Sequence, residues 1–234
     1  MARRKKPKPR LRRVLRAGSF MVLGIVLFSV LLVLPLRWFN PATTAFMLQD
    51  DSGAPLRHKW VGWQDIGIAA KLAVVAAEDQ RFADHSGIDI GAIQRAVHEK
   101  DQRGYLRGAS TISQQTTKNL FLWPGRSFGR KGLEAWLTVV AEVCLPKQRI
   151  LEIYLNVAEF GPGIYGVGAA SEHYFGASPA RLSDPQAALL AAVLPNPRQR
   201  SVHNPSDYVR ERQHWILAQM GRLQREAWIN RISR

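Results

Sequence analysis

The chain has a single cysteine, Cys144, so an internal disulfide framework is excluded and nothing in the fold depends on an oxidising compartment. Within "LTVVAEVCLP" this cysteine is expected to be a small buried apolar residue. Internal repeats, low-complexity stretches and clear β-alternation are also lacking. With 234 residues, 46% of them hydrophobic, the chain is long enough for one domain with a real core plus an appendage, and too short for two full enzyme domains.

Acidic residues are absent from the first sixteen positions, which hold nine of the Lys and Arg residues and leave +6 of the net +15 for the rest of the chain. Residues 17–36 then carry no charge, and about 20 apolar residues are needed to cross a bilayer as a helix. Since basic flanks stay cytoplasmic, we expect a cytoplasmic tail over 1–16, a transmembrane helix over 17–37 and everything after Trp38 outside.

A cleaved signal peptide is the alternative interpretation of this N-terminus. Its apolar region would be about 7–15 residues long, shorter than the run seen here, and "NPATTA" (residues 40–45) is only a weak cleavage site. An uncleaved anchor is therefore favoured. Nucleic acid is a poor partner, because the most basic segment lies on the opposite side of the membrane from the folded domain.

The remaining sequence is predicted to be mainly α-helical. Residues 38–66 are interpreted as a stalk or lead-in, and residues 67–234 as the catalytic domain. Two capping-box patterns, Thr111 with Gln114 and Ser183 with Gln186, mark helix starts. The predicted helices cover approximately residues 69–80, 90–100, 111–123, 130–145, 147–160, 169–175, 184–194 and 208–232. The glycines of "GPGIYGVG" (residues 161–168) are expected to form a tight loop, since no strand precedes them for a nucleotide motif.

Glu78 follows directly on an apolar helical run, "LAVVAA". Apolar neighbours and a helix C-terminus both raise the pKa of a carboxyl group, and such a group suits a general base near neutral pH. The alternative is a solvated residue just past the helix end. Asp79 is expected to cap or to pair, and His85, in a turn, to be a hydrogen-bonding loop residue rather than part of a metal site.

A second stretch, "GASTISQQTTKNLFLWPGRSFGRKGLE" (residues 108–134), combines cations with amides. Lys118, Arg126, Arg130 and Lys131 would suit a phosphate-bearing ligand, above all a pyrophosphate leaving group. Free N–H groups near Ser110 and Thr111, at a helix start, would also favour an anion. The alternative is a surface ion pair between Glu134 and the two cations one turn before it, worth about 0.3–0.5 kcal/mol; both interpretations stay open.

Five ordered motifs connect these stretches: "EDQRFADHSGID", "GASTISQQTTKN", "RKGLE", "QRILEIYLN" and "GAASEHYFG…LSDPQAALLAAVLPNP". Together, over about Leu72 to Pro197, they closely resemble the peptidoglycan transglycosylases of glycosyltransferase family 51, most closely the monofunctional form with one transmembrane helix. Ala109 stands where many members have glycine. The resemblance implies a mainly α, lysozyme-like helical catalytic domain with a small membrane-contacting lobe.

The resemblance also implies a reaction and residue roles. The substrate would be lipid II, and Glu78 would take the proton from the acceptor hydroxyl, which attacks the donor with inversion and forms a β-1,4 bond. Lys118 and Arg126 would stabilise the departing undecaprenyl pyrophosphate, and Glu134 would be the second essential carboxylate, supporting those cations. Further matching positions, assigned to substrate binding, are Ser110, Thr111, Gln115, Asn119, Arg130, Lys131, Asp79, Phe82 and His85.

No organic cofactor is expected and no metal ligands are assigned, although the family's behaviour implies that a divalent cation, Mg²⁺ or Mn²⁺, can stimulate the reaction. Expected partners are lipid II, the growing glycan strand, the bilayer and other cell-wall synthesis or division proteins. Leu106, Leu120, Phe121, Leu122 and Trp123 could dip into the lipid, the alternative being core packing. The chain leaves no room for a transpeptidase domain, so other proteins are expected to crosslink the product.

Two other functions stay in competition at this point. A lytic, lysozyme-like muramidase would also place a glutamate in a sugar cleft, but it has no need of cations beside the leaving group. A non-catalytic membrane scaffold would use the basic tail and the C-terminal helix to recruit cell-wall proteins, and would keep its function after Glu78→Gln.

Overall fold

The structure is a computed structural model that describes residues 9–103, 110–125, 127–225 and 232. The helices of the first half are α1 (Pro9–Val33), η1 (Leu34–Arg37), α2 (Ala45–Leu48), η2 (Trp63–Asp65), α3 (Ile68–Glu78), α4 (Ile90–Arg103) and α5 (Ile112–Phe121). Those of the second half are α6 (Phe128–Cys144), α7 (Lys147–Val157), α8 (Gly166–Phe175), η3 (Pro179–Arg181), α9 (Asp184–Val193) and α10 (Asp207–Arg225). The predicted mainly α fold is confirmed.

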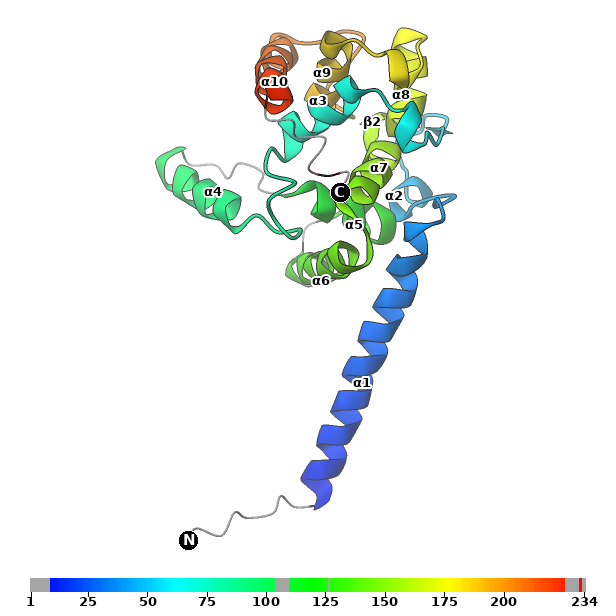
Figure 1. Ribbon diagram of the computed structural model, residues 1–234, viewed down its shortest axis with the longest axis vertical. Helices are drawn as coiled ribbons and strands as arrows, with labels where there is room; N and C mark the ends of the chain where they lie inside the picture. Colours follow the sequence, from blue (N-terminus) through cyan, green and yellow to red (C-terminus); the bar gives the residue numbers. More distant parts are fainter. Residues whose placement is uncertain (1–8, 104–109, 126, 226–231, 233–234) are drawn as a thin grey trace.

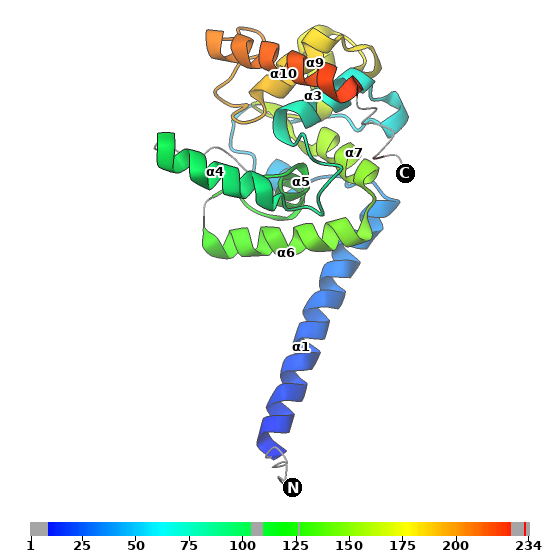
Figure 2. The ribbon, with the colours of Figure 1, turned by 60° about the vertical axis from the view of Figure 1, so that its left-hand side comes forward.

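The molecule consists of a helical body from which α1 projects as a single long rod (Figure 1). Helix α6 lies across the base of the body, next to the end of α1, while α9 and α10 lie at the far end (Figure 2). The segment Arg13–Arg37 is long and apolar enough to cross a membrane. The predicted N-terminal apolar helix is present, and it begins earlier than expected, because the basic residues from Pro9 onward belong to the same helix.

The junction between α1 and the body is held by hydrogen bonds. Arg149 of α7 donates to the carbonyls of Leu36 and Phe39, at 2.7 and 3.0 Å, and to Asn40. Trp136 of α6 donates from Nε1 to Ser29 Oγ of α1 at 2.9 Å. These contacts, made by two helices of the body, hold α1 and the residues that follow it against the body.

Helix α3 runs through the centre of the core. Its residues from Ala69 to Ala76 are all buried, and it packs against α9 and α10. Alanines dominate the facing helix α9, where Ala188, Ala191 and Ala192 are fully shielded, and their small size permits close helix approach. Cys144 is buried and unpaired, as predicted. Packing in the core thus holds α3 almost to its C-terminal residue, Glu78.

A small sheet replaces part of the predicted helix and loop. Helix α7 ends at Val157 rather than Phe160, and β2 (Glu159–Gly161) pairs antiparallel with β3 (Ile164–Tyr165). Strand β1 (Arg57–His58) completes the order β1-β3-β2 and is parallel to β3. The predicted tight loop is present as the turn at Pro162 and Gly163, but the strands on either side of it were missed, because strands of two or three residues are too short to show alternation.

Residues 38–66, interpreted as a stalk or lead-in, pack on the body along part of their length. Thr44 caps α2, and Met47 of that helix is buried. Asn156, fully buried in α7, accepts a hydrogen bond from Val61 N at 2.7 Å and donates to Val61 O at 2.9 Å. This segment therefore helps to build the folded body. The last predicted helix is described only to Arg225, and Trp228 lies outside the described residues.

Candidate active site

Glu78 ends α3 in a cleft beside α5. Its Oε2 accepts a hydrogen bond from Gln115 Nε2 at 2.9 Å, while Oε1 is shielded from solvent and has no hydrogen-bond partner among the described residues. Burial raises the pKa of the Glu78 carboxyl group, and the Gln115 hydrogen bond and the charges of Arg212 and Lys118 oppose that rise. The interpretation of Glu78 as a solvated residue is therefore wrong.

A hydrogen-bonded pair fixes the neighbour of this carboxylate. Tyr154, fully buried in α7, donates from its hydroxyl to Gln115 Oε1 at 3.1 Å, so the Gln115 amide nitrogen points at Glu78. Burial, together with the charges of Glu78 and Asp79, holds the pKa of Tyr154 well above its usual value. Tyr154 consequently stays a donor, and one oxygen of Glu78 is left available to accept a proton.

The cations gather around a cavity of about 520 Å³ next to this carboxylate. Lys118 lies on α5, one turn after Gln115, while Arg130 and Lys131 come from the start of α6. Burial lowers the pKa of Lys118, and Glu134 and Glu78 oppose that shift. The cavity is lined by Phe46, Ser110, Gln115, Lys118, Trp123, Pro124, Gly125, Arg130, Lys131 and Glu134.

Glu134 is the counter-charge of this cavity. Its side chain is only 3% exposed and accepts hydrogen bonds from Arg130 Nη1 at 2.8 Å and from Lys131 Nζ. Lys131 Nζ also lies 3.4 Å from Ser110 Oγ. A surface ion pair is thus the wrong description of this cluster. It is a partly buried network with more positive than negative charge, which suits an anionic ligand.

A second cavity, of about 410 Å³, is lined by Glu78 itself. Ser110 lines both cavities, and Trp215 of α10 contributes to the second one. Arg81 and Arg95 also line it and lie 3.5 and 3.8 Å from the Asp89 carboxylate. Glu78 therefore lines the polar cavity, while its hydrogen-bond partner Gln115 lines the cation-rich one, which is an arrangement for two ligands meeting near one carboxylate.

Several residues that were predicted to bind substrate make hydrogen bonds that hold neighbouring helices together. Asp79 pairs with His85 at 2.9 Å and accepts a hydrogen bond from Ile112 N at 3.0 Å, so it caps α5. Thr111 is the N-cap of that helix and donates to Gly87 O, and its predicted capping box with Gln114 is confirmed. These residues hold α3 and α5 in register.

Phe82 is fully buried in the core, so its side chain supports the site from within rather than reaching a ligand. Asn119 is buried on α5. Of the apolar residues expected at the lipid, Leu120 and Leu122 are buried and Trp123 is exposed at the rim of the cation-rich cavity. Arg126 and Leu106 lie outside the described residues.

Arg212, Tyr154 and Trp215 lie at the site although sequence reasoning did not single them out as site residues. Arg212 and Trp215 belong to α10, more than a hundred positions after Glu78, and Tyr154 lies inside the motif "QRILEIYLN". The motif was the one available signal, because no local pattern shows which faces of α7 and α10 turn toward α3.

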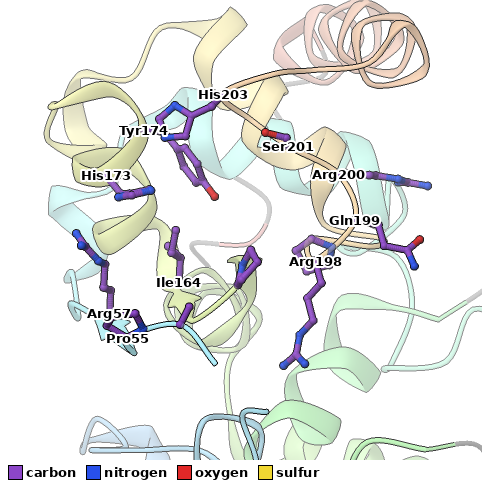
Figure 3. Close-up of a pocket in the computed structure, with 13 residues that line it drawn as sticks. Pro55, Arg57, Ile164, His173, Tyr174, Arg198, Gln199, Arg200, Ser201 and His203 are labelled. Atoms are coloured by element: carbon purple, nitrogen blue, oxygen red, sulfur yellow. The ribbon is translucent and has the colours of Figure 1, made fainter. Parts of the chain in front are cut away.

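A third cavity, of about 430 Å³, lies apart from Glu78 and shares no lining residue with the other two (Figure 3). Arginines and histidines line it, but Arg198 is already paired with Asp50, Asp51 and Glu159. In Figure 3 Arg200 extends away from His173 and Tyr174. The charged side chains of this third cavity do not point toward one place. We therefore assign the reacting groups to the cleft at Glu78.

The described residues do not fit a protein-held divalent cation in the cation-rich cavity. Its one lining carboxylate, Glu134, is already paired with Arg130 and Lys131. Within the described ranges, no group of three or more His, Cys, Asp or Glu residues could hold a metal ion.

Comparison with known proteins gives one consistent result. The model of the Transglycosylase family matches residues 47–221. A biosynthetic peptidoglycan transglycosylase of Stutzerimonas stutzeri is 50% identical over 229 residues, which cover 95% of each chain. The proteins with the same name from Chromohalobacter salexigens and Shewanella oneidensis are 49% and 48% identical, and the matches cover 95% and 91% of this chain and 98% and 93% of theirs.

Proposed function

Since the chain belongs to the transglycosylase family, we propose that it is a peptidoglycan glycosyltransferase that polymerises glycan strands from lipid II. In this reaction the GlcNAc 4-hydroxyl of one lipid II attacks C1 of the MurNAc that ends the growing chain. A C–O bond forms in the β-1,4 configuration, the α-linked pyrophosphate leaves with its undecaprenyl chain, and the anomeric centre inverts.

The placement of Glu78 carries this proposal. The unpaired Oε1 accepts the hydroxyl proton as the oxygen attacks, and burial keeps the carboxylate basic enough for that step. Gln115 holds the other oxygen, so the orientation of the base does not depend on the substrate. A general base of this kind contributes about 10²–10⁴-fold to the rate.

The cation-rich cavity supplies the second half of the chemistry. Negative charge develops on the pyrophosphate as its bond to C1 breaks, and Lys118, Arg130 and Lys131 surround the space in which it would lie. Glu134 keeps these cations from repelling one another before the ligand arrives. Arg126, outside the described residues, is proposed to join them on the basis of the family motif.

The outer face of α6 supports a position at the membrane surface. Leu133, Trp136, Val139 and Val143 form a stripe at helical spacing and are all exposed, and Phe128 at the start of α6 is fully exposed. Helix α6 lies across the end of α1 (Figure 2). An apolar face beside a membrane-spanning rod is suited to the bilayer interface, where a polyprenyl substrate is confined.

The proposed topology is a single pass through the inner membrane with the N-terminus cytoplasmic, as the basic residues before the anchor favour. It can be tested in a Cys144→Ser background carrying Ala218→Cys on the exposed side of α10. Labelling by a membrane-impermeant thiol reagent on intact spheroplasts would support an extracytoplasmic domain. Labelling only after lysis would reverse the topology.

A stimulating Mg²⁺ or Mn²⁺ and contacts with other cell-wall synthesis or division proteins are also proposed. The residues at the cavity do not hold a cation, so a stimulatory ion would arrive with the pyrophosphate of the substrate. Its effect is measured by comparing polymerisation in chelator with polymerisation after Mg²⁺ or Mn²⁺ is added back.

Labelled lipid II, supplied to the purified full-length protein in nanodiscs, tests the reaction. Longer glycan strands support transfer, whereas shortening of preformed glycan indicates a lytic muramidase. Glu78→Gln is expected to abolish elongation, and Lys118→Ala to reduce it strongly. A protein that recruits partners in cells but never extends glycan, with or without Glu78, would be a scaffold. The exposed residue Arg181, away from both cavities, gives the matched control Arg181→Gln.

A further inference from the structure

Arg212 reaches from α10 to the last turn of α3. Its Nη2 donates a hydrogen bond to the carbonyl oxygen of Ala77 at 3.1 Å, one residue before Glu78. The last carbonyls of a helix have no partner within that helix, and their partial negative charge disfavours a carboxylate beside them. Arg212 therefore satisfies one of these carbonyls and places a positive charge at an end that would otherwise repel Glu78.

Among the described residues, the Arg212 guanidinium is not paired with a carboxylate. Among the described residues no ion pair includes Arg212, and its Nε is buried without a hydrogen-bond partner. The groups that act on Glu78 are Gln115 and Lys118 from α5, Arg212 from α10, and Asp79 beside it on the chain; Tyr154 of α7 lies behind Gln115. Of the two cations, Arg212 lowers the pKa of Glu78 more than Lys118 does.

We infer that Arg212 is a positioning residue for the proposed base: it holds the end of α3 and supplies a fixed positive charge behind Glu78 without occupying the carboxylate. The inference rests on the proposed function, in which Glu78 must be ionised before the acceptor hydroxyl arrives. Sequence position gives no hint of this role, since Arg212 lies beyond the last family motif.

Arg212 binds a backbone carbonyl rather than the Glu78 carboxylate, and this difference affects proton transfer. Glu134 shows the alternative, because each of its two oxygens is paired with a cation. An arginine paired in that way with Glu78 would stabilise the carboxylate but block the oxygen that the proton must reach. Binding to the carbonyl of Ala77 instead keeps the charge close and leaves Oε1 without a hydrogen-bond partner among the described residues.

The test compares Arg212→Met, Arg212→Lys and the control Arg210→Met, which changes an exposed arginine two residues earlier on the same helix. Polymerisation of labelled lipid II by the full-length protein in nanodiscs is measured as kcat and KM over a range of pH. Loss of the positive charge is expected to move the acid limb of kcat to higher pH, and each unit of that movement lowers the rate below the limb about tenfold. We expect KM to stay unchanged, the rate to recover at alkaline pH, and Arg212→Lys and Arg210→Met to keep most or all of the wild-type profile.

A fall in kcat by the same factor at every pH would overturn the inference and leave Arg212 a purely structural residue, as would an unchanged profile. A second measurement does not depend on activity. The side-chain carbon of Glu78, identified in ¹³C-Glu spectra by its loss in Glu78→Gln, should titrate at higher pH in Arg212→Met than in wild type. If Glu78→Gln still elongates glycan, the proposed function fails, while this titration still decides whether Arg212 acts on Glu78.

Discussion

The replacement Glu78→Gln should make the protein inactive and, at neutral pH, more stable. In the wild type one carboxylate oxygen is buried with no hydrogen-bond partner among the described residues, and the other accepts a single hydrogen bond from Gln115. A glutamine keeps the acceptor for that bond and removes the buried charge. Removing the charge from one poorly paired buried group is worth about 1–3 kcal/mol. For a protein of this size that gain corresponds to a rise of about 2–10 °C in melting temperature.

The pH dependence distinguishes this explanation from a general packing effect. Burial raises the pKa of Glu78 in the folded state above its value in the unfolded chain, so the folded protein binds more protons there. Below the unfolded value, about pH 4.3, the group is neutral in both states and the variant gains nothing from losing the charge. As pH rises through the folded pKa the wild type loses stability at this position, and above it the difference between the two proteins is constant.

Thermal unfolding of both proteins, followed in nanodiscs at one scan rate and at a series of pH values, measures the difference. The reasoning is refuted if Glu78→Gln melts below the wild type at neutral pH, or if the difference between the two is the same at acidic and neutral pH. Arg210→Met, which changes an exposed arginine that takes part in no ion pair among the described residues, should melt with the wild type throughout.

Three further changes test other parts of the site. Glu134→Gln leaves the buried Arg130 and the half-exposed Lys131 without a counter-charge. Because of the buried pair, it should lower the free energy of unfolding by about 3–5 kcal/mol and strongly reduce polymerisation, and added pyrophosphate should restore part of the melting temperature. Asp79→Asn weakens the acceptor for Ile112 N at the start of α5 and should cost about 1–3 kcal/mol by chemical denaturation, with activity falling in parallel. Gly166→Ala places a methyl group 2.5 Å from the carbonyl oxygen of Asn156 at a φ of +81°, and should cost at least 1 kcal/mol in the same assay; a variant with wild-type stability would show that the turn can relax.

The sequence predicts those parts of the site that are determined within one element. The capping boxes at Thr111 and Ser183 are local patterns, and both are present in the structure. The position of Glu78 at the end of an apolar helix follows from the run before it. The pairing of Glu134 with Arg130 and Lys131 follows from helical spacing, although its burial does not.

What the sequence does not predict depends on contacts between distant elements. The strands of the small sheet are two or three residues long, and β1, from residues 57–58, pairs with the distant strand β3. Phe82 lies in a functional-looking motif, yet packing places it inside the core. The orientation of Gln115 depends on Tyr154, and no periodicity within either helix reveals which of their faces meet.

The two glutamates of this site, Glu134 and Glu78, have different partners and therefore different roles. Lys118 and its neighbouring cations line one cavity, and Glu134 pairs with Arg130 and Lys131 directly as their counter-ion. Glu78 must stay both ionised and open, so it receives an amide hydrogen bond and, from behind, a charge bound to a backbone carbonyl. Two glutamates close to the same lysine are thereby separated into a counter-ion and a base, because only one of them is directly paired with cations. Exchanging these arrangements, by giving Glu78 a paired cation, should remove the base without removing the carboxylate.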